Sequence, residues 1–415
     1  MISEIIAIGD ELLIGQVVNT NASWLGEQLF NLGIPARYAT TVGDDEGAIL
    51  DAFDRALKRS DVVLVTGGLG PTHDDITRAA ACKYFKTDLV EDPIVLAQVA
   101  SIFRRRGIDL TPSNRAQALV PRGCTVLPNS SGTAPGMRFD RDGKMLCIMP
   151  GVPREMKHIF TNEIRPSLVG KSATGKVART MNTTGIAESL LFELIGPVPA
   201  VEAGLGKLAF LPSLRGVRMR ITVERPDQGE ADAIAARMEA FIRERAGKFI
   251  FGVGDETLEE AVGGLLRHHH RSLALAESCT GGFIAHMITN VSGSSEYFLR
   301  GYVTYANSAK TDMLGVPAAL IDRHGAVSAE VAEAMAKGAR ERAGADIAVS
   351  TTGVAGPLGG TAEKPVGLVW IAVSDAHRTT SHKYTFSTDR MANKERFASM
   401  ALELLRRRLL EIDEA

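Results

Sequence analysis

Cysteine, net charge and long apolar runs are all scarce in this chain of 415 residues. Its four cysteines form no Cys-x-x-Cys pair, which argues against a zinc site and against a dense disulfide framework. The formal net charge is only −2, so the chain as a whole offers no electrostatic attraction for nucleic acid or for an anionic membrane. No apolar run is long enough to span a bilayer, and the N-terminus lacks the basic leader of a signal peptide. We therefore expect a cytoplasmic protein that works in a reducing compartment without a membrane partner.

What the chain does contain is enough apolar material for several buried sheets. Hydrophobic residues make up 45% of the sequence and charged residues 23%, and there are 41 glycines. This composition is typical of an α/β protein. The length exceeds one ordinary hydrophobic core. Shifts in the pattern of elements predict three domains, at residues 1–170, 171–252 and 253–415.

The segment 273–282 reads as a strand, a tight turn and the approach to a helix that begins at Phe283. Ser278 lies in the turn, where backbone N–H groups at a helix start lack an intrahelical partner and carry the positive end of the helix dipole. Such a turn suits an oxyanion or a phosphate. Ser278 is therefore a candidate nucleophile, and the candidate N–H donors are those of Thr280, Gly281 and Gly282. The alternative is that Ser278 is an ordinary helix N-cap.

A second strand, at 298–305, passes into another helix and brings a lysine to the helix start. Asn307 is the expected N-cap, which places Lys310 in the first helical turn. The helix dipole and partial burial would both lower the pKa of this amine and make it a general base. A hydroxyl nucleophile, a lysine that takes its proton and Tyr305 as a relay or orienting group would together suit acyl transfer at an amide or ester.

A third strand, at 346–350, runs into the loop 351–360, which is rich in glycine. Such a loop lets the backbone approach the phosphate or ring of a mononucleotide closely, and the Thr352 hydroxyl can donate to a substrate. The next strand follows 364–367 and ends near Val373.

Two helices complete this region. Thr257 and Glu260 fit a capping box, so a helix is expected from Leu258 to about His269. A long amphipathic helix is expected at 393–411.

Four motifs of this region resemble the nicotinamide-nucleotide amidase domain of the CinA family. They are Ser-Cys-Thr-Gly-Gly at 278–282, Tyr-Ala-Asn-Ser-Ala-Lys at 305–310, Thr-Gly-Val-Ala-Gly-Pro at 352–357 and Lys-Pro-Val-Gly at 364–367. The resemblance implies hydrolysis of the carboxamide of nicotinamide mononucleotide to nicotinate mononucleotide and ammonia, with no cofactor. It implies that the catalytic positions are Ser278, Tyr305 and Lys310. It also implies that substrate is bound by Thr280, Gly281, Gly282, Asn307, Thr352, Gly353 and Gly356.

Residues 1–170 alternate between strands and helices, which predicts a parallel sheet flanked by helices. Strands are expected at 4–8, 36–41 and 61–66, and helices at 22–32 and 47–59. In such sheets ligands bind beyond the carboxyl ends of the strands, where the polar and glycine-rich segments of this region fall. The candidate binding residues there are Gly9, Asp10, Glu11, Gly67, Gly68, Gly70, Thr72, Ser131, Gly132, Pro150 and Gly151.

The glycine-rich turn at 67–70 lets the backbone approach a phosphate, and Asp74 and Asp75 just beyond it can hold a hard divalent cation. One interpretation is a metal-assisted diphosphate site. The other is that these carboxylates cap the helix that starts near Ile76 while the glycines only turn the chain. His73 has no second histidine at ligand spacing, so we expect it to be solvated or to bind substrate.

This first region resembles the molybdopterin-binding fold of the MoaB and MogA proteins, in the variant that forms the N-terminal domain of CinA. The resemblance covers nearly all of residues 1–170. It implies that Asp44 and Asp75 are the metal positions and that a divalent cation, Mg, Mn or Co, is required. The implied activity is an ADP-ribose pyrophosphatase that yields AMP and ribose 5-phosphate.

Residues 171–252 predict a small α+β module. After a linker at 171–175, strands are expected at 176–182, 207–211 and 217–224, with helices at 186–194 and 229–246. The module resembles the KH-like domain of the same family, but it lacks aromatic platforms and a Gly-x-x-Gly loop with basic flanks. We therefore expect no nucleic-acid partner and a role in spacing or dimerisation. A homodimer is implied by the resemblance to the family.

Together these interpretations predict a bifunctional hydrolase of pyridine-nucleotide salvage. The alternative is a regulatory protein that binds a nucleotide or a pterin in one or both pockets without turnover. The intact set of Ser278, Tyr305 and Lys310 favours turnover in the C-terminal half.

Overall fold

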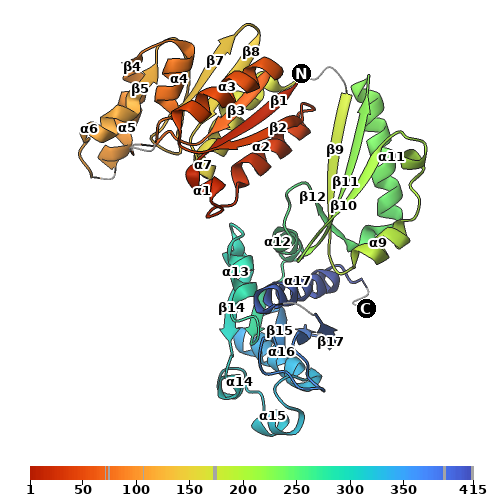
Figure 1. Cartoon of the computed structure of the whole chain (residues 1–415). Coiled ribbons are helices and arrows are strands. Elements are labelled where there is room, and N and C mark those ends of the chain that lie inside the picture. Colours follow the sequence, from red (N-terminus) through yellow and green to blue (C-terminus); the bar gives the residue numbers. More distant parts are fainter. Residues whose placement is uncertain (71, 73–74, 106, 172–174, 387–388, 413–415) are drawn as a thin grey trace. The chain divides into compact units, whose positions relative to one another are not determined.

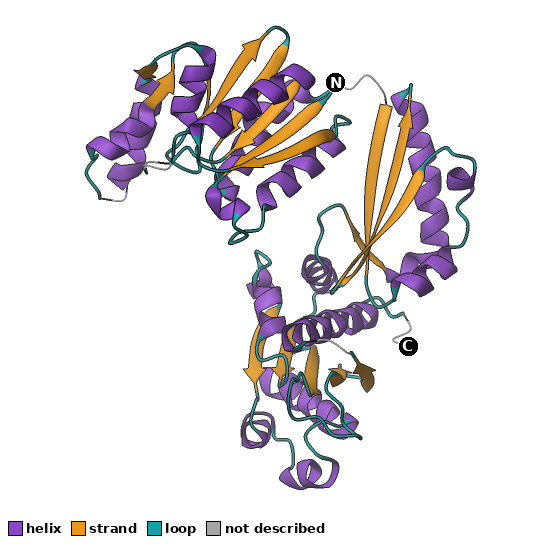
Figure 2. Cartoon of the chain, in the orientation of Figure 1, coloured by secondary structure: helices purple, strands orange, loops and turns teal. Residues whose placement is uncertain are grey.

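The computed structural model describes residues 1–70, 72, 75–105, 107–171, 175–386 and 389–412, so most of the predicted linker at 171–175 lies outside the described residues. Its contacts divide the chain into two compact units, Met1–Ala178 with Val223–Ala233, and Arg179–Thr222 with Ile234–Ala415. Both units combine helices with sheets (Figure 1, Figure 2), which confirms the predicted α/β class. Within the described ranges, no helix is both long enough and apolar enough to cross a membrane.

The first unit contains a six-stranded sheet in the order β2-β1-β3-β8-β7-β6. The strands β2, β1, β3 and β8 are parallel, as predicted, whereas β7 and β6 form an antiparallel edge. The chain reverses between β7 and β8 because Asp142 and Gly143 both have positive φ and form a two-residue hairpin turn. The predicted parallel sheet is therefore confirmed, and it carries in addition an antiparallel edge that the sequence does not predict. The strands of the unit are β1 (Ser3–Ile8), β2 (Ala36–Val42), β3 (Val62–Thr66), β4 (Leu89–Glu91), β5 (Leu119–Pro121), β6 (Thr125–Leu127), β7 (Gly136–Arg141) and β8 (Lys144–Met149).

Helices cover both faces of this sheet because successive side chains of its buried strands point to opposite sides. In β1, Ile6 and Ile8 pack in one hydrophobic cluster with residues of α3 and α4, whereas Ile5 packs in another with residues of α2 and α7. The helices of the unit are α1 (Asp10–Leu13), α2 (Thr20–Asn31), α3 (Glu46–Arg59), α4 (Thr77–Phe85), α5 (Pro93–Arg105), α6 (Pro112–Arg115), α7 (Pro153–Ile159) and α8 (Arg165–Leu168).

Residues 175–253 form a four-stranded sheet in the order β10-β11-β9-β12. The three predicted strands and two predicted helices of this segment are confirmed. The sequence pattern does not predict β12, because its four residues include a glycine and show no alternation. The elements are β9 (Gly175–Thr183), α9 (Glu188–Ile195), α10 (Pro199–Glu202), β10 (Lys207–Ser213), β11 (Gly216–Arg225), α11 (Gln228–Ala246) and β12 (Ile250–Val253).

The C-terminal sheet has five strands in the order β14-β13-β15-β16-β17. β13 is parallel to β14 and β15, while β16 and β17 are antiparallel additions. The predicted strands are confirmed, and β17 is one that the sequence analysis does not identify. The strands are β13 (Leu273–Glu277), β14 (Phe298–Val303), β15 (Ile347–Gly353), β16 (Leu368–Ser374) and β17 (Thr379–Thr385).

Helices cover both faces of this sheet as well, because successive side chains of a strand point to opposite sides. Leu273 and Leu275 of β13 join the cluster with α12, α13 and α17, and Ala274 and Ala276 join the cluster with α14, α15 and α16. The predicted capping box at the start of α12 is confirmed. The helices are α12 (Leu258–His268), α13 (Phe283–Thr289), α14 (Asn307–Leu314), α15 (Ala318–His324), α16 (Ala329–Ala343) and α17 (Arg390–Leu409).

Candidate active site

Three parallel strands end at one edge of the C-terminal sheet. Because β13 pairs in parallel with both β14 and β15, Glu277 at its end lies beside Val303 and Thr351. The chain leaves these strand ends through the turn at Ser278, the segment 304–306 and the loop after β15. The sheet itself therefore brings the three sequence motifs together.

The Ser278 hydroxyl and the Lys310 amine meet at this edge, as the sequence predicts. Nζ of Lys310 lies 3.2 Å from Oγ of Ser278, and the lysine is only 1% exposed. Burial lowers the pKa of the Lys310 amine from its usual value. The same Nζ donates to the backbone carbonyls of Thr304, at 3.0 Å, and Tyr305, at 3.4 Å.

These contacts suit a neutral amine that acts as a base. A neutral lysine has two N–H groups and one lone pair. When the two carbonyls accept the two N–H groups, the lone pair remains for the proton of the Ser278 hydroxyl. The site can therefore activate a hydroxyl for nucleophilic attack.

The alternative role for Ser278, a helix N-cap, is excluded. α13 begins at Phe283, and its N-cap is Gly282, which has a φ of 90° and provides no side-chain cap. The N–H of Ser278 donates to the carbonyl of Thr351, and its hydroxyl has Lys310 as its partner.

Most of the expected oxyanion donors are already engaged. The buried carboxylate of Glu277 accepts hydrogen bonds of 2.8–3.1 Å from three N–H groups at the start of α13, those of Gly282, Ile284 and Ala285. The N–H of Gly281 donates to the carbonyl of Ser278. The predicted donor roles of Gly281 and Gly282 are therefore wrong, because an internal carboxylate and the turn itself satisfy these groups. The Thr280 N–H has no hydrogen-bond partner among the described residues, but Thr280 is fully buried, so this N–H is not presented to a substrate either.

The thiol next to Ser278 is a poor rival nucleophile. Cys279 is buried, and burial raises the pKa of its thiol to about 12. The thiolate is the reactive form of cysteine, and it is negligible at neutral pH when the pKa is this high. The hydroxyl of Ser278 is therefore the better candidate.

A cavity of about 290 Å³ opens over Ser278 and Lys310. Tyr305, Asn307, Thr352, Gly353 and Gly356 line it, together with Cys279, Ala326, Val327, Val354, Ala355, Leu358, Gly359 and Arg390. Thr280, Gly281 and Gly282 are not among the lining residues. The structure thus gathers most of the predicted residues around one cavity.

Two of the lining residues differ from their predicted roles. The Thr352 hydroxyl donates to the carbonyl of Ala326 at 2.7 Å, so its proton is not free for a substrate. Asn307 is not the N-cap of α14: the helix starts at Asn307 itself, and Ala306, in an extended conformation, is the N-cap. The Asn307 side chain is exposed and makes no capping hydrogen bond.

The sequence pattern gives no sign of a further site residue, Arg390, the first residue of α17. Its Nη1 donates to the carbonyl of Gly356 at 2.7 Å, and its Nη2 donates to the hydroxyl of Tyr305 at 3.0 Å. No hydrogen bond joins the Tyr305 hydroxyl to Ser278 or Lys310 in the described part of the chain, so the predicted proton relay through Tyr305 is not supported. Instead, Tyr305 and Arg390 are hydrogen-bonded to each other and form one side of the cavity, where the guanidinium of Arg390 supplies a positive charge.

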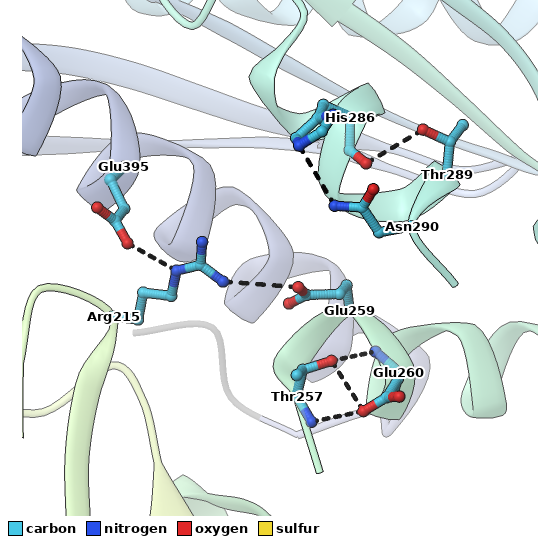
Figure 3. Close-up of polar contacts among 8 residues, drawn as sticks. All are labelled: Arg215, Thr257, Glu259, Glu260, His286, Thr289, Asn290 and Glu395. Carbon is cyan, nitrogen blue, oxygen red and sulfur yellow. Dashed lines mark hydrogen bonds and ion pairs between the residues drawn. The ribbon is translucent and has the colours of Figure 1, made fainter. Parts of the chain in front are cut away.

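The middle segment contacts α17 within the same unit. Arg215, in the turn between β10 and β11, lies 2.7 Å from Glu395 of α17 and 3.5 Å from Glu259 of α12 (Figure 3). The capping box of Thr257 and Glu260 begins α12 beside this contact (Figure 3). Arg215 therefore links the middle segment to the helix whose first residue lines the cavity.

In the first unit, the predicted loops also gather at the carboxyl edge of the sheet. A Cβ on Gly67 would lie 2.1 Å from the carbonyl oxygen of Ile8, and one on Gly151 would lie 3.5 Å from Cα of Gly67. The N–H of Gly9 donates to the carbonyl of Val42. The loops after β1, β3 and β8 are therefore in close contact, and only glycine at 67 permits that contact.

Hydrogen bonds from backbone N–H groups to carboxylates connect these loops. The N–H of Asp10 donates to Oδ2 of Asp44 at 3.0 Å, and the N–H of Asp44 donates to Oδ1 of Asp10 at 3.1 Å. Glu11 lies against Gly9, where an added Cβ would be 2.5 Å from Oε1 of Glu11. The acidic residues after β1 and β2 thus form one polar cluster.

Asp75 does not cap the helix that follows it. Its Oδ2 accepts from the N–H and the hydroxyl of Thr72, at 2.9 and 2.5 Å, while the N-cap of α4 is Ile76, without a side-chain cap. A Cβ on Gly70 would lie 2.5 Å from the same oxygen, so glycine leaves room for the carboxylate. The capping interpretation is therefore wrong for Asp75. His73 and Asp74 lie outside the described residues.

The remaining loops are held by residues that the sequence analysis does not assign to the site. Asn129 accepts from the N–H of Ser131 at 3.1 Å and donates to Glu155 at 2.6 Å, and a Cβ on Gly132 would meet the carboxylate of Glu155. In the neighbouring loop, side chains donate to the backbone carbonyls: Thr66 to Pro150 at 3.0 Å, and Asn21 to Gly151 at 2.7 Å. Arg78, whose pKa burial lowers, donates to the carbonyl of Gly70.

The donor chemistry of this edge fits a hard divalent cation. Carboxylate oxygen is the ligand type that Mg²⁺ and Mn²⁺ prefer. Within the described ranges, no three His, Cys, Asp or Glu side chains converge where one ion could bind. A cation here would therefore be held by one or two carboxylates together with substrate oxygens and water, as is usual for Mg²⁺.

The fold and the clustered motifs define a multidomain α/β protein, and three family models match successive ranges of the chain. Residues 4–169 match the model described as "Probable molybdopterin binding domain", residues 178–252 match the CinA KH domain, and residues 255–409 match the CinA C-terminal domain. A CinA-like protein of Salinibacter ruber is 47% identical over 411 residues, which cover 99% of this chain and 100% of that protein. A CinA-like protein of Chloroherpeton thalassium is 43% identical over 414 residues, covering 98% and 99%. The chain belongs to the CinA family.

Solved structures match shorter parts of the chain. The crystal structure of a CinA protein from Thermoplasma acidophilum is 37% identical, covers 40% of this chain and 98% of its own, and has a TM-score of 0.38. The structure of a competence/damage inducible protein from Agrobacterium tumefaciens is 41% identical, covers 36% and 91%, and has a TM-score of 0.35.

Proposed function

We propose that the C-terminal cavity hydrolyses the carboxamide of nicotinamide mononucleotide to nicotinate mononucleotide and ammonia. The observation that carries this proposal is the 3.2 Å contact between Lys310 and Ser278 inside a cavity bordered by a glycine-rich loop. A buried lysine with a lowered pKa that touches a hydroxyl is costly to maintain, and it is the arrangement that an acyl-transfer enzyme needs. A protein that only binds nucleotides has no use for this contact, so we favour turnover over regulation without catalysis.

The proposed reaction uses residues of this chain alone. Lys310 takes the proton of the Ser278 hydroxyl as Oγ attacks the carboxamide carbon. The C–N bond then breaks, and Lys310 returns the proton to the leaving ammonia. Water, deprotonated by the same amine, hydrolyses the resulting ester and regenerates Ser278. We propose no metal for these steps.

We propose that Arg390 binds the phosphate of the substrate. Its guanidinium lines the cavity and is oriented by Gly356 and Tyr305. Arginine is well suited to phosphate because its planar fork can donate two parallel hydrogen bonds.

Replacing Arg390 should therefore weaken binding more than chemistry. Arg390→Ala is expected to raise KM and lower kcat/KM by about 10–100-fold, the size of a lost hydrogen bond to a charged group, with a smaller change in kcat. The measurement is ammonia release against nicotinamide mononucleotide concentration. Arg323→Ala, which removes an exposed arginine of α15 outside the cavity, is the matched control and should behave as wild type. An unchanged KM in Arg390→Ala would assign the phosphate to another group.

For the first unit we propose hydrolysis of ADP-ribose to AMP and ribose 5-phosphate. The support is the set of carboxylates and close-packed glycine loops at one sheet edge. Asp44 and Asp75 would hold a divalent cation, Mg, Mn or Co, which would neutralise the diphosphate and lower the pKa of a bound water. We further propose that the chain functions as a homodimer, with the KH-like segment serving spacing or dimerisation rather than nucleic-acid binding.

Removing the cation or Asp75 should stop this second reaction. AMP formation from ADP-ribose is expected to fall to background in chelator, to return on adding Mg²⁺ or Mn²⁺, and to stay at background in Asp75→Ala. Asp54→Asn changes a half-exposed carboxylate on α3 whose ion-pair partner among the described residues is Lys58, and it should keep full activity. Full AMP formation in chelator would refute the metal role, and ammonia release by the other unit should be unaffected throughout.

A further inference from the structure

A second cavity in the same unit as Ser278 is larger and shares none of its lining residues. It has a volume of about 450 Å³ and lies between the β10–β11 turn, the end of β17 and one side of α17. This volume is within the range of small-molecule sites, which is roughly 300–1,000 Å³. The side chains that matter to its chemistry are Arg215, Tyr384, Phe386, Arg396, Ser399 and Met400.

Two polar groups at this cavity are buried without partners. Ser399 is 4% exposed, and its Oγ has no hydrogen-bond partner in the described part of the chain. Nε of Arg396 is also buried without a hydrogen-bond partner in the described part of the chain. Buried polar atoms are normally paired, because an unpaired one loses its hydration without compensation. Both residues line the cavity, so a rotation of either side chain toward it would let a ligand supply the missing acceptor.

The charge at this cavity favours an anion. Among the described residues no carboxylate lies within ion-pair distance of Arg396, whose guanidinium rests 5.7 Å from the ring centroid of Phe386. Arg215 is already neutralised by Glu395 and Glu259 (Figure 3). The acidic lining residue Glu188 is exposed at the start of α9, where solvent screens it. Arg396 is therefore the cation left to attract a ligand.

The walls around Arg396 favour a planar, apolar group. The rings of Tyr384 and Phe386 are nearly parallel, at 18°, with centroids 6.2 Å apart, and Met400 adds a flexible apolar side chain. Aromatic rings and methionine accommodate flat ligands readily. From the unpartnered polar atoms, the single free cation among the described lining residues and the aromatic wall, we propose that this cavity binds a planar aromatic anion of the mononucleotide class. Its acidic group would contact Arg396 and Ser399, and its ring would pack on Tyr384, Phe386 and Met400.

The site can be tested on the full-length chain through the methyl group of Met400. AMP is titrated into protein with ¹³C-methyl methionine, and the Met400 signal is assigned with Met400→Leu. The proposal predicts a saturable shift of that signal. Adenosine, which lacks the phosphate, should bind at least about tenfold more weakly, the cost of losing a hydrogen bond to a charged group. Nicotinate, a flat aromatic carboxylate without ribose or phosphate, serves as a second probe: a shift with AMP and none with nicotinate supports a mononucleotide, and a shift with nicotinate alone would contradict the mononucleotide class.

Two variants separate this site from binding elsewhere. Arg396→Gln should weaken AMP binding at Met400 by about 10–100-fold, whereas Arg323→Gln, at an exposed arginine outside both cavities, should leave it unchanged. Ser399→Ala should weaken binding while the melting temperature stays the same or rises, because the lost hydroxyl has no partner. A Met400 signal unmoved by both probes, or AMP affinity at Met400 unaltered in Arg396→Gln and in Ser399→Ala, would overturn the proposal.

Discussion

Ser278→Ala is expected to reduce ammonia release from nicotinamide mononucleotide by roughly 10⁴–10⁶-fold, the scale of loss when a hydroxyl nucleophile is removed from a hydrolase. The reason is that Oγ of Ser278 is the atom proposed to form the ester, and it is the group that Lys310 contacts at 3.2 Å. Loss of this small hydroxyl leaves the packing of the turn in place, so the folded state should persist. The measurement is steady-state ammonia release, with circular dichroism to confirm the fold.

The adjacent thiol provides a matched control. Cys279→Ala removes one atom from the neighbouring side chain, and it should retain most of the activity because burial keeps the Cys279 pKa near 12. If Ser278→Ala kept near-native turnover while Cys279→Ala lost it, the assignment of the nucleophile would be reversed.

Lys310→Met should lower kcat/KM by about 10²–10⁴-fold, the usual contribution of a general base. Methionine has a similar length and suits a site where the lysine is almost fully buried, so the fold should tolerate it. Lys310→Arg tests the base directly, since a guanidinium stays protonated and cannot accept the Ser278 proton. Near-native kcat/KM in Lys310→Arg would exclude Lys310 as the base.

The lowered pKa of Lys310 also predicts two pH dependences with defined signs. Wild-type kcat/KM should rise with pH through that lowered pKa and reach a plateau below 10.5, the ordinary value for lysine. Between these two values the unfolded chain binds more protons at this position than the folded chain, so folding stability gains with rising pH. Relative to Lys310→Met, the wild type should therefore become more stable as pH rises through this window. An unchanged difference in stability would show that burial does not shift this amine.

The meeting of Ser278 and Lys310 could be predicted from sequence because each follows a strand that opens into a helix. When β13, β14 and β15 are parallel neighbours, their carboxyl ends must share an edge. The glycine-rich loop after β15 reaches the same cavity for the same reason. Local strand and helix patterns were sufficient for this part of the site.

The residues that the sequence did not identify act through contacts that no local pattern encodes. Glu277 ends an apolar strand, and its role as an internal cap of α13 depends on the turn folding back over it. Arg390 comes from a helix far along the chain and joins Tyr305 and Gly356 only in the folded unit. Thr352 looked free as a donor because its acceptor, the carbonyl of Ala326, lies in a separate loop.

In the first unit, the glycine positions were more predictable than the partners of the carboxylates. Gly67 and Gly70 are needed because the carbonyl of Ile8 and the carboxylate of Asp75 occupy the space of a Cβ. The hydrogen bonds between Asp10 and Asp44 join two loops, so their pairing follows from strand order and register rather than from either loop alone.

The central claim is that this chain cleaves the amide bond of nicotinamide mononucleotide at Ser278. The most direct test is to incubate the purified full-length protein with this nucleotide and chelator in H₂¹⁸O, and to identify every product by mass spectrometry. We expect one nicotinate mononucleotide for each ammonia, with one ¹⁸O in its carboxylate and no reaction in Ser278→Ala. Recovery of unchanged nucleotide, or release of free nicotinamide by cleavage of the glycosidic bond, would contradict it.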